Sequence, residues 1–249
     1  EVSPLKEDFT EKYPISQKIM RFVGEAIRDY SMIGPGDRIM IGLSGGKDSL
    51  ILSLALAVLR RRSPVKFGLS ASLIDQTGGT METAKVEEFM GELEIPLTIF
   101  SHPTFSIMEE RDERSPCSLC ANLRRGILAG QAKEAGANVL ALGHHKDDAV
   151  ETVLLNLFYG GRFKCWQPSM FMSRTEIRVI RPLAYTEERR IALEAARLGL
   201  PVTSACCPYS EDSKRLSAKN ILKEMEKEMP EIKSNVIHAL KNVLERDVW

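Results

Sequence analysis

The sequence predicts an α/β fold, in which a doubly wound, mostly parallel sheet carries helices on both faces. Two observations favour this class. Short apolar runs with strand character alternate with longer segments whose apolar residues recur at helical spacing. Two glycine-containing polar motifs directly follow two of these runs, which is where such sheets bind ligands. With 249 residues and 43% hydrophobic content, the chain is long enough to bury a large core.

The elements are expected in the following order along the chain. A helix is expected at residues 14–30, where Ile15, Ile19 and Val23 share one face, and it ends before the turn Gly34-Pro35-Gly36. Strands are expected at 38–43, 66–74, 97–100, 139–142 and 179–180. Helices are expected between them at 50–59, 80–92, 123–134 and 149–158, and charged helices afterwards at 187–198, 217–227 and 231–245.

This pattern divides the chain into three expected parts. Residues 1–36 form an N-terminal helical segment, 37–185 a nucleotide-binding domain, and 186–249 a C-terminal helical extension. No apolar run reaches the roughly 18 residues of a membrane span, and the N-terminus lacks the apolar core of a signal peptide. We therefore expect a soluble, cytoplasmic protein without a membrane partner.

Charge and cysteine content restrict the function classes. The 34 basic and 34 acidic residues balance, so any binding of nucleic acid must depend on local basic patches. The five cysteines are an odd number, and in a reducing compartment they indicate metal ligands or reactive thiols more than disulfides.

The first motif is Ser44-Gly45-Gly46-Lys47-Asp48-Ser49, which follows the strand expected at 38–43. Its glycines allow backbone N–H groups to approach an anion, and the N-terminus of the following helix favours negative charge. The loop G-x-x-x-x-G-K-[ST] does not fit, because Ile41 stands at its first glycine and Asp48 at its hydroxyl. The motif predicts a phosphate loop of another kind, the alternative being an ordinary strand-to-helix turn.

The second motif, Gly143-His144-His145-Lys146-Asp147-Asp148, follows the strand expected at 139–142. Its carboxylates and imidazoles are suited to holding magnesium against phosphate or to acid–base chemistry. Helix capping by Asp147 or Asp148 is the competing interpretation. Zinc is disfavoured, since the H-E-x-x-H spacing is absent from this run.

Cysteines form a third candidate site. Cys117 and Cys120 are close enough in sequence to bind one metal or cluster, and Cys206 and Cys207 supply further thiols. Adjacent Cys206 and Cys207 fit a four-cysteine zinc ion poorly, which favours three thiolates. A redox pair and incidental buried cysteines remain the alternatives, and Cys165 is expected to be an isolated thiol.

These motifs resemble a known family. Ser44–Ser49 resembles the loop of the PP-loop ATP pyrophosphatase superfamily, which has an adenine nucleotide alpha hydrolase-like fold. Pro-Cys-Ser-Leu-Cys at 116–120, Leu-Arg-Arg-Gly-Ile-Leu at 123–128, Gly-His-His-Lys-Asp-Asp at 143–148 and Val-Ile-Arg-Pro-Leu-Ala-Tyr at 179–185 resemble the tRNA 2-thiocytidine synthetase family. The resemblance implies ATP-dependent tRNA thiolation, forming AMP and pyrophosphate, with ATP, Mg2+ and a 4Fe-4S cluster as cofactors.

The resemblance also implies roles for particular residues. Ser44, Gly45, Gly46, Asp48 and Ser49 would hold pyrophosphate or its magnesium, with Lys47 in the same loop and Gly143 and His144 beside the nucleotide. Asp48, Arg124 and Asp148 are the implied catalytic residues. Cys117, Cys120 and Cys207 are the implied cluster ligands, Cys207 being preferred to Cys206 because Cys-Pro-Tyr at 207–209 is similar to the related 2-thiouridine synthetases.

Substrate and partners follow from the same resemblance. The implied substrate is a pyrimidine of tRNA, most of the motifs favouring cytidine in the anticodon loop, with cysteine desulfurase or sulfide as sulfur donor and a homodimer as a possible assembly. Alternatives are a 2-thiouridine synthetase, a lysidine-forming or amidating ligase, and a nucleotide-binding redox or metal sensor. Three basic clusters are candidates for RNA contact: Arg60–Arg62, the aromatic-containing loop 160–168 with Arg162 and Lys164, and Arg189-Arg190.

Overall fold

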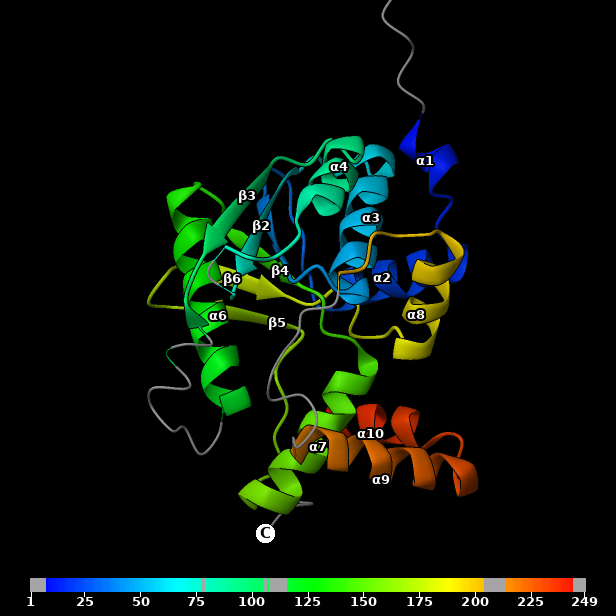
Figure 1. Ribbon diagram of the computed structural model, residues 1–249. Helices are drawn as coiled ribbons and strands as arrows, with labels where there is room; N and C mark the ends of the chain where they lie inside the picture. Colours follow the sequence, from blue (N-terminus) through cyan, green and yellow to red (C-terminus); the bar gives the residue numbers. More distant parts are fainter. Residues whose placement is uncertain (1–7, 78, 105–106, 108–115, 204–213, 244–249) are drawn as a thin grey trace, which may run out of the picture.

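A computed structural model describes residues 8–77, 79–104, 107, 116–203 and 214–243 (Figure 1). Within these residues a six-stranded sheet has the order β3-β2-β1-β4-β6-β5. Its strands are β1 (Arg38–Leu43), β2 (Gly68–Asp75), β3 (Leu97–Ser101), β4 (Val139–Leu142), β5 (Ser169–Met172) and β6 (Ile177–Ile180). All neighbouring pairs are parallel except β5 and β6, so the expected mostly parallel α/β sheet is confirmed.

The helices of the described residues alternate with these strands. Their bounds are α1 (Phe9–Lys12), α2 (Gln17–Asp29), α3 (Lys47–Arg62), α4 (Ala84–Glu92), α6 (Pro116–Glu134), α7 (Lys146–Gly160), α8 (Glu188–Arg197), α9 (Lys214–Glu228) and α10 (Ile232–Lys241). Among the described residues, no helix is both long and apolar enough to cross a membrane.

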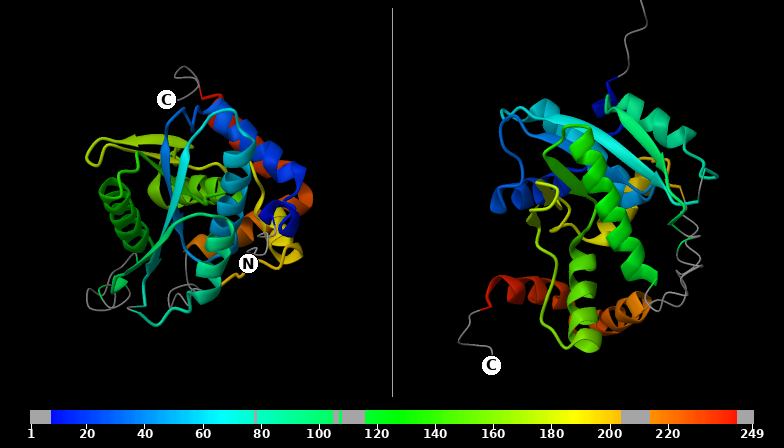
Figure 2. Two further views of the ribbon diagram at one scale, coloured as in Figure 1. Left: turned by 90° about the horizontal axis from the view of Figure 1, so that it is seen from above. Right: turned by 90° about the vertical axis from the view of Figure 1, so that its left-hand side faces the viewer.

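Helices cover both faces of the sheet, as the alternation within β1 shows. Ile39, Ile41 and Leu43 pack into a large core with α2, α3, α4 and α8, whereas Met40 points to a second core formed with α6. Successive strand residues point to opposite faces, so one apolar strand serves both cores. The two layers are visible in Figures 1 and 2, with α6 on one side of the sheet and α3 on the other.

Strand order creates one crevice at the edge where the parallel strands end. From β1 the chain proceeds outward through β2 and β3, and then returns to place β4 and β6 on the other side of β1. The reversal lies between β1 and β4, and ligands of open α/β sheets bind beyond the carboxyl ends of the strands at such a point. Both polar motifs follow these two strands, so the topology brings them together.

Helix α7 projects from this edge and carries the C-terminal helices (Figure 1). Val150 and Leu154 of α7 pack against Ala218 and Leu222 of α9 in a small core, with Val236 and Ile237 of α10 beside it. Helices α9 and α10 are thereby held against α7 at the carboxyl edge of the sheet.

Several element boundaries differ from expectation. Helix α6 begins at Pro116 instead of residue 123, so Cys117 and Cys120 lie within its first turns and not before it. Helix α3 begins at Lys47, three residues earlier than expected, because Gly46 is its N-cap. Strand β5 was not expected, because its four residues show little apolar alternation. It is a strand because it pairs with β6 at the edge of the sheet, where it is half-buried.

Candidate active site

The phosphate loop is a tight turn that its own side chains hold in shape. Ser49 Oγ donates to the carbonyl of Gly46 at 2.9 Å, and the backbone N–H groups of Ser44 and Gly46 donate to Ser49 Oγ and Ser44 Oγ at 3.3 and 3.4 Å. No side chain caps the N-terminus of α3. The first helical N–H groups therefore face the crevice and are suited to an anion.

Two glycines of the site are required by close approach. Gly45 has φ of +74°, and a Cβ on it would lie 2.0 Å from Thr203 Oγ1. A Cβ on Gly143 would lie 3.2 Å from the carbonyl carbon of Asp48 and from the backbone nitrogen of Ser49. The end of β4 is thus pressed against the first turn of α3, and the two motifs form one site.

Asp48 is half-buried beneath the loop and incompletely paired. Lys47 Nζ donates to its Oδ2 at 3.1 Å and also lies 3.1 Å from its Oδ1, which is buried and accepts no hydrogen bond among the described residues. His145 Nε2 lies 3.7 Å from that oxygen. Burial raises the pKa of Asp48, although His145 and Lys47 oppose the shift. A buried carboxylate oxygen left in this way is suited to a metal ion or its bound water.

Lys47 turns away from the crevice toward α8. Its Nζ lies 3.2 Å from Glu188 Oε1, and Lys219 of α9 donates to Glu188 Oε2 at 2.6 Å. Burial opposes the charged carboxylate, but Lys219 and Lys47 outweigh it and hold the pKa of Glu188 at about 2. Glu188 thus connects the phosphate loop to the C-terminal extension, a link that no local pattern in the sequence indicates.

The second motif both caps helix α7 and faces the phosphate loop. His145 is the N-cap of α7: its Nδ1 accepts from the N–H of Asp148 at 3.3 Å, and Asp148 Oδ2 accepts from the N–H of His145 at 3.0 Å. Because Nδ1 accepts this hydrogen bond, a proton on the other ring nitrogen, Nε2, faces Asp48. Asp148 Oδ1 lies 3.4 Å from Arg215 Nη1.

Asp147 links helices and does not face the phosphate loop. Its Oδ2 accepts from the N–H of Glu188 at 2.7 Å, and its Oδ1 lies 2.7 Å from Lys233 Nζ. It therefore joins the start of α7 to α8 and α10. Helix capping of α7, the competing interpretation, is confirmed for Asp148, which forms the capping box with His145, and not for Asp147.

His144 points away from the phosphate loop into an aromatic and cationic environment. Its ring lies 5.7 Å from that of Trp166, whose face lies 5.0 Å from the guanidinium of Arg181. Burial, assisted by Arg181, lowers the pKa of His144 to about 4, although Asp148 opposes the shift. The imidazole is therefore neutral at physiological pH.

A cleft of about 750 Å³ opens at the loop, a volume within the usual range of ligand sites. It is lined by Ser44, by Arg124 of α6, by Gln76 and Thr77 after β2, and by Thr203. Sequence reasoning missed Gln76, Thr77 and Thr203. The run Asp75-Gln76-Thr77 at a strand end was a usable signal for the first two, because Asp75 accepts from the N–H and the Oγ1 of Thr77 at 2.8 and 2.6 Å and shapes that turn.

The cysteine side of the site is described in part. Gln76 Nε2 donates to Cys120 Sγ at 3.1 Å, which places this thiol at the rim of the cleft, one helical turn before Arg124. Cys117 lies in the first turn of α6, and Cys206 and Cys207 lie outside the described residues. In the part of the chain that is described, no three His, Cys, Asp or Glu side chains are grouped to hold a metal ion.

The remaining thiol and basic clusters lie elsewhere. Burial raises the pKa of Cys165 to about 11, and its Sγ lies 3.5 Å from the carbonyl of Ala149, so it is a poor thiolate. Arg60 and Arg61 are engaged at the far end of α3, where Arg60 donates to backbone carbonyls and Arg61 pairs with Asp8. Those two arginines are not among the residues that line the cleft.

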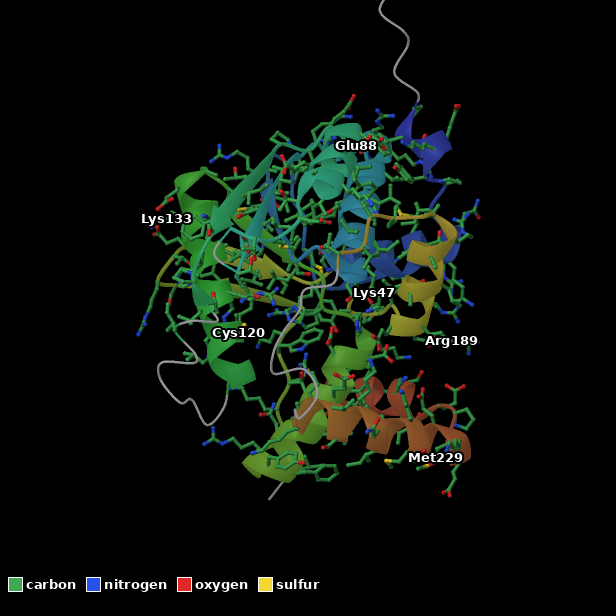
Figure 3. All side chains as sticks on the ribbon, viewed as in Figure 1. Lys47, Glu88, Cys120, Lys133, Arg189 and Met229 are labelled. Atoms are coloured by element: carbon green, nitrogen blue, oxygen red, sulfur yellow. The ribbon has the colours of Figure 1, made fainter. Side chains whose placement is uncertain are left out.

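The residues present fit ATP and magnesium at the phosphate loop. The uncapped start of α3 and the close glycines favour an anion, and the buried Asp48 Oδ1, which accepts no hydrogen bond among the described residues, favours a cation beside it. Figure 3 shows Lys47 and Cys120 at the same carboxyl edge of the sheet, on α3 and α6. For a cluster, the Cys120 thiol at the cleft rim fits a ligand.

Known proteins are similar to this chain in sequence. The PP-loop domain family matches residues 14–200. The tRNA-cytidine(32) 2-sulfurtransferase of Pelobacter propionicus is 43% identical over 234 residues, covering 92% of this chain and 87% of the relative. The protein of the same name from Geobacter metallireducens is 41% identical, covering 92% and 91%.

A solved structure shares the fold. The U34-tRNA thiolase NcsA from Methanococcus maripaludis, determined with its 4Fe-4S cluster, superposes with a TM-score of 0.74 over 92% of this chain and 79% of that one, at 24% identity. Since the family matches most of the chain, and relatives above 40% identity span nearly all of it, this chain belongs to the PP-loop domain family and, within it, to the tRNA-cytidine(32) 2-sulfurtransferases.

Proposed function

We propose that this chain is an ATP-dependent enzyme that replaces the C2 oxygen of a cytidine in the tRNA anticodon loop with sulfur. One observation carries the proposal: a single cleft joins the phosphate loop at Ser44, the cation Arg124 and, through Gln76, the thiol of Cys120. The relatives named above are tRNA-cytidine(32) 2-sulfurtransferases, which supports cytidine as the target.

The chemistry requires that the C2 oxygen be made a leaving group. A pyrimidine carbonyl oxygen leaves poorly, so it first attacks the α-phosphorus of ATP and pyrophosphate departs. A sulfur nucleophile then adds to C2, and AMP leaves with the original oxygen. In the first step the N–H groups at the start of α3, with Ser44 and Ser49, stabilise the charge that develops on pyrophosphate.

Other side chains supply cations around the reacting atoms. Magnesium, held at Asp48 and approached by Asp148, would neutralise the phosphate oxygens. Arg124 projects into the cleft beside the thiol of Cys120 and is suited to the charge on the departing AMP. A 4Fe-4S cluster on Cys117, Cys120 and Cys207 would supply sulfur at the one iron that no cysteine holds.

We also propose that residues 186–249 form an extension that carries the third cluster ligand to the cleft. Support comes from contacts that fold this part back: Glu188 lies 3.2 Å from Lys47 of the phosphate loop, and Arg215 lies 3.4 Å from Asp148. Residue 214, where α9 begins, follows the Cys207 segment closely in sequence.

The test is an anaerobic assay with reconstituted protein, Mg-ATP, sulfide and anticodon stem-loop RNAs that carry cytidine or uridine at the target position. We expect one AMP and one pyrophosphate for each 2-thiocytidine formed, with none from the uridine RNA. Formation of 2-thiouridine instead would make the enzyme a thiouridine synthetase. ATP cleavage that requires an amine and yields no thionucleoside would support a lysidine-type ligase.

A further inference from the structure

The C-terminal end of α7 exposes aromatic side chains that the fold does not cover. Phe158, Tyr159 and Phe163 are 58%, 54% and 48% exposed. They lie within six residues of one another, at the tip that projects below the sheet in Figure 1. Contiguous exposed apolar surface of this kind marks an interaction site more often than a free surface.

Cations surround these rings. Arg162 and Lys164 are exposed beside Phe163, and Lys214 Nζ lies 4.8 Å from the ring centroid of Tyr159. Across the described parts of the chain, none of the three cations has an ion-pair partner, whereas Arg215, Lys219 and Lys233 of the neighbouring C-terminal helices do. We call Phe158, Tyr159, Arg162, Phe163, Lys164 and Lys214 the α7-tip patch.

The α7-tip patch is a built structure and not a loose loop. Gly161 ends α7 in the left-handed conformation with φ of +58°, and the N–H of Arg162 donates to the carbonyl of Asn156 at 2.9 Å. Asn156 Nδ2 donates to the carbonyl of Lys164 at 2.8 Å. These hydrogen bonds fold residues 161–164 back on the helix end, which fixes the rings and cations relative to one another.

The patch lies at a useful distance from the nucleotide. The N-terminus of α7 holds His145 and Asp148 at the site, and 15 helical residues span about 22 Å. That length corresponds to roughly six stacked nucleotides at about 3.4 Å each. A polynucleotide whose target base enters the cleft can therefore extend along α7 to its tip.

Two occupants have to be compared, an RNA strand and a second copy of the chain. Self-association across a two-fold axis would bring the three cations, which have no ion-pair partner among the described residues, against their own copies, which is repulsive. An RNA strand instead offers phosphates to the cations and base faces to the rings, the combination by which proteins bind single strands. Charge complementarity therefore favours RNA.

We propose that the α7-tip patch binds unpaired tRNA nucleotides that flank the target base, by stacking on Phe158, Tyr159 and Phe163 and by pairing of the cations with phosphates. This inference rests on the proposed function, since it assigns a surface to the tRNA of that reaction. The patch positions the RNA while the chemistry takes place at the other end of α7.

Binding of a fluorescently labelled anticodon stem-loop RNA to the full chain tests the proposal. In the Phe158→Ser/Tyr159→Ser variant, the Kd is expected to rise at least about fivefold, the lower end of what removing one base stack costs. In the Arg162→Glu/Lys164→Glu variant, the slope of log K against log salt is expected to become shallower by about one for each phosphate that the protein no longer neutralises. Both variants should raise KM for RNA and keep kcat.

Matched controls come from the opposite edge of the sheet. Phe171 is 65% exposed and Arg174 is exposed, and because β5 is antiparallel to β6 its end lies away from the cleft. Phe171→Ser and Arg174→Glu should leave RNA binding unchanged. Patch variants that behave like these controls would overturn the proposal, as would variants that convert a dimer to monomers without weakening RNA binding.

The outcomes separate the two proposals. If the unaltered protein forms 2-thiocytidine while the patch variants keep its KM and Kd for RNA, only the α7-tip patch is wrong. If the unaltered protein forms no thionucleoside with ATP and sulfide, the proposed function is wrong, whatever the patch variants do.

Discussion

The two sides of the cleft are built in different ways. On the phosphate side, one short turn after β1 and one after β4 supply the phosphate loop and its carboxylates, and Gly45 and Gly143 allow close approach. On the thiol side, Cys120 approaches the cleft from α6, on the other face of the sheet, through a hydrogen bond with Gln76. The further ligands proposed for a cluster come from elsewhere in the chain.

This difference predicts how each side responds to change. The phosphate side is preformed by local backbone geometry, so single substitutions there should alter turnover or nucleotide affinity and leave the thiol side intact. The thiol side depends on bringing remote segments together, so removing one thiol should eliminate the sulfur source and leave nucleotide binding intact. The two sides should therefore fail independently.

The largest expected effect lies on the thiol side. Cys120→Ala should abolish both thiolation and the iron and sulfide content of anaerobically prepared protein, while ATP binding measured by calorimetry is retained. Cys165→Ala is the matched control, because the buried thiol of Cys165 has a raised pKa and should bind no iron. Stoichiometric zinc without sulfide in the unaltered protein would contradict the cluster assignment.

On the phosphate side, Asp48→Ala should reduce kcat by about a hundredfold or more, as removal of a group that stabilises developing charge does. Iron and sulfide content should not change, because Asp48 contacts His145 and Lys47 and no thiol. Both expectations are tested by measuring kcat and the iron and sulfide content of the same sample. A variant that loses its cluster together with its activity would show that the two sides are not independent.

A smaller effect is expected from Gly45→Ala. The substitution places a methyl group 2.0 Å from Thr203 Oγ1 and imposes a side chain at φ of +74°, which costs about 1–2 kcal/mol from the backbone alone. The KM for ATP should rise about tenfold or more. Adding Thr203→Ala removes the clashing oxygen and should restore part of the affinity, whereas no recovery would mean that the strain is entirely in the backbone.

The smallest effect at neutral pH is expected from His144→Asn, and it should grow on acidification. Because burial lowers the pKa of His144 to about 4, the unfolded chain takes up a proton between pH 6.5 and 4 that the folded chain excludes. The stabilisation that comes from excluding this proton from His144 is therefore fully present above about pH 6.5 and is lost as pH falls toward 4. Between pH 7 and 5 the free energy of unfolding, measured by urea titration, should fall by about 2 kcal/mol more for the unaltered protein than for the variant. Equal decreases in the two proteins would contradict a neutral His144.

Much of the fold was predictable because its signals are local. The apolar run at β1 and the glycines after it specify a strand, a turn and a helix within a dozen residues, and the alternation of strands and helices indicates a parallel sheet. Strand β5 was missed because pairing at the sheet edge, and not its own pattern, makes it a strand.

The site was less predictable than the fold, because only part of it is formed by local motifs. Motif positions such as Ser44 and Gly143 could be placed at strand ends in advance, and strand order then joined them. Glu188 and Thr203 could not be found, since each reaches the loop from a segment more than 130 residues away. Their roles arise from tertiary packing, which a single sequence does not display.

The central claim is that the cytidine oxygen is activated by transfer of adenylate, and the fate of that oxygen tests it most directly. An anticodon stem-loop RNA with 18O at C2 of the target cytidine would be thiolated in one turnover with unlabelled ATP and water. The mechanism predicts one 18O atom in the phosphate of AMP for each 2-thiocytidine formed. AMP without the label, or label found only in water, would contradict adenylylation of the base.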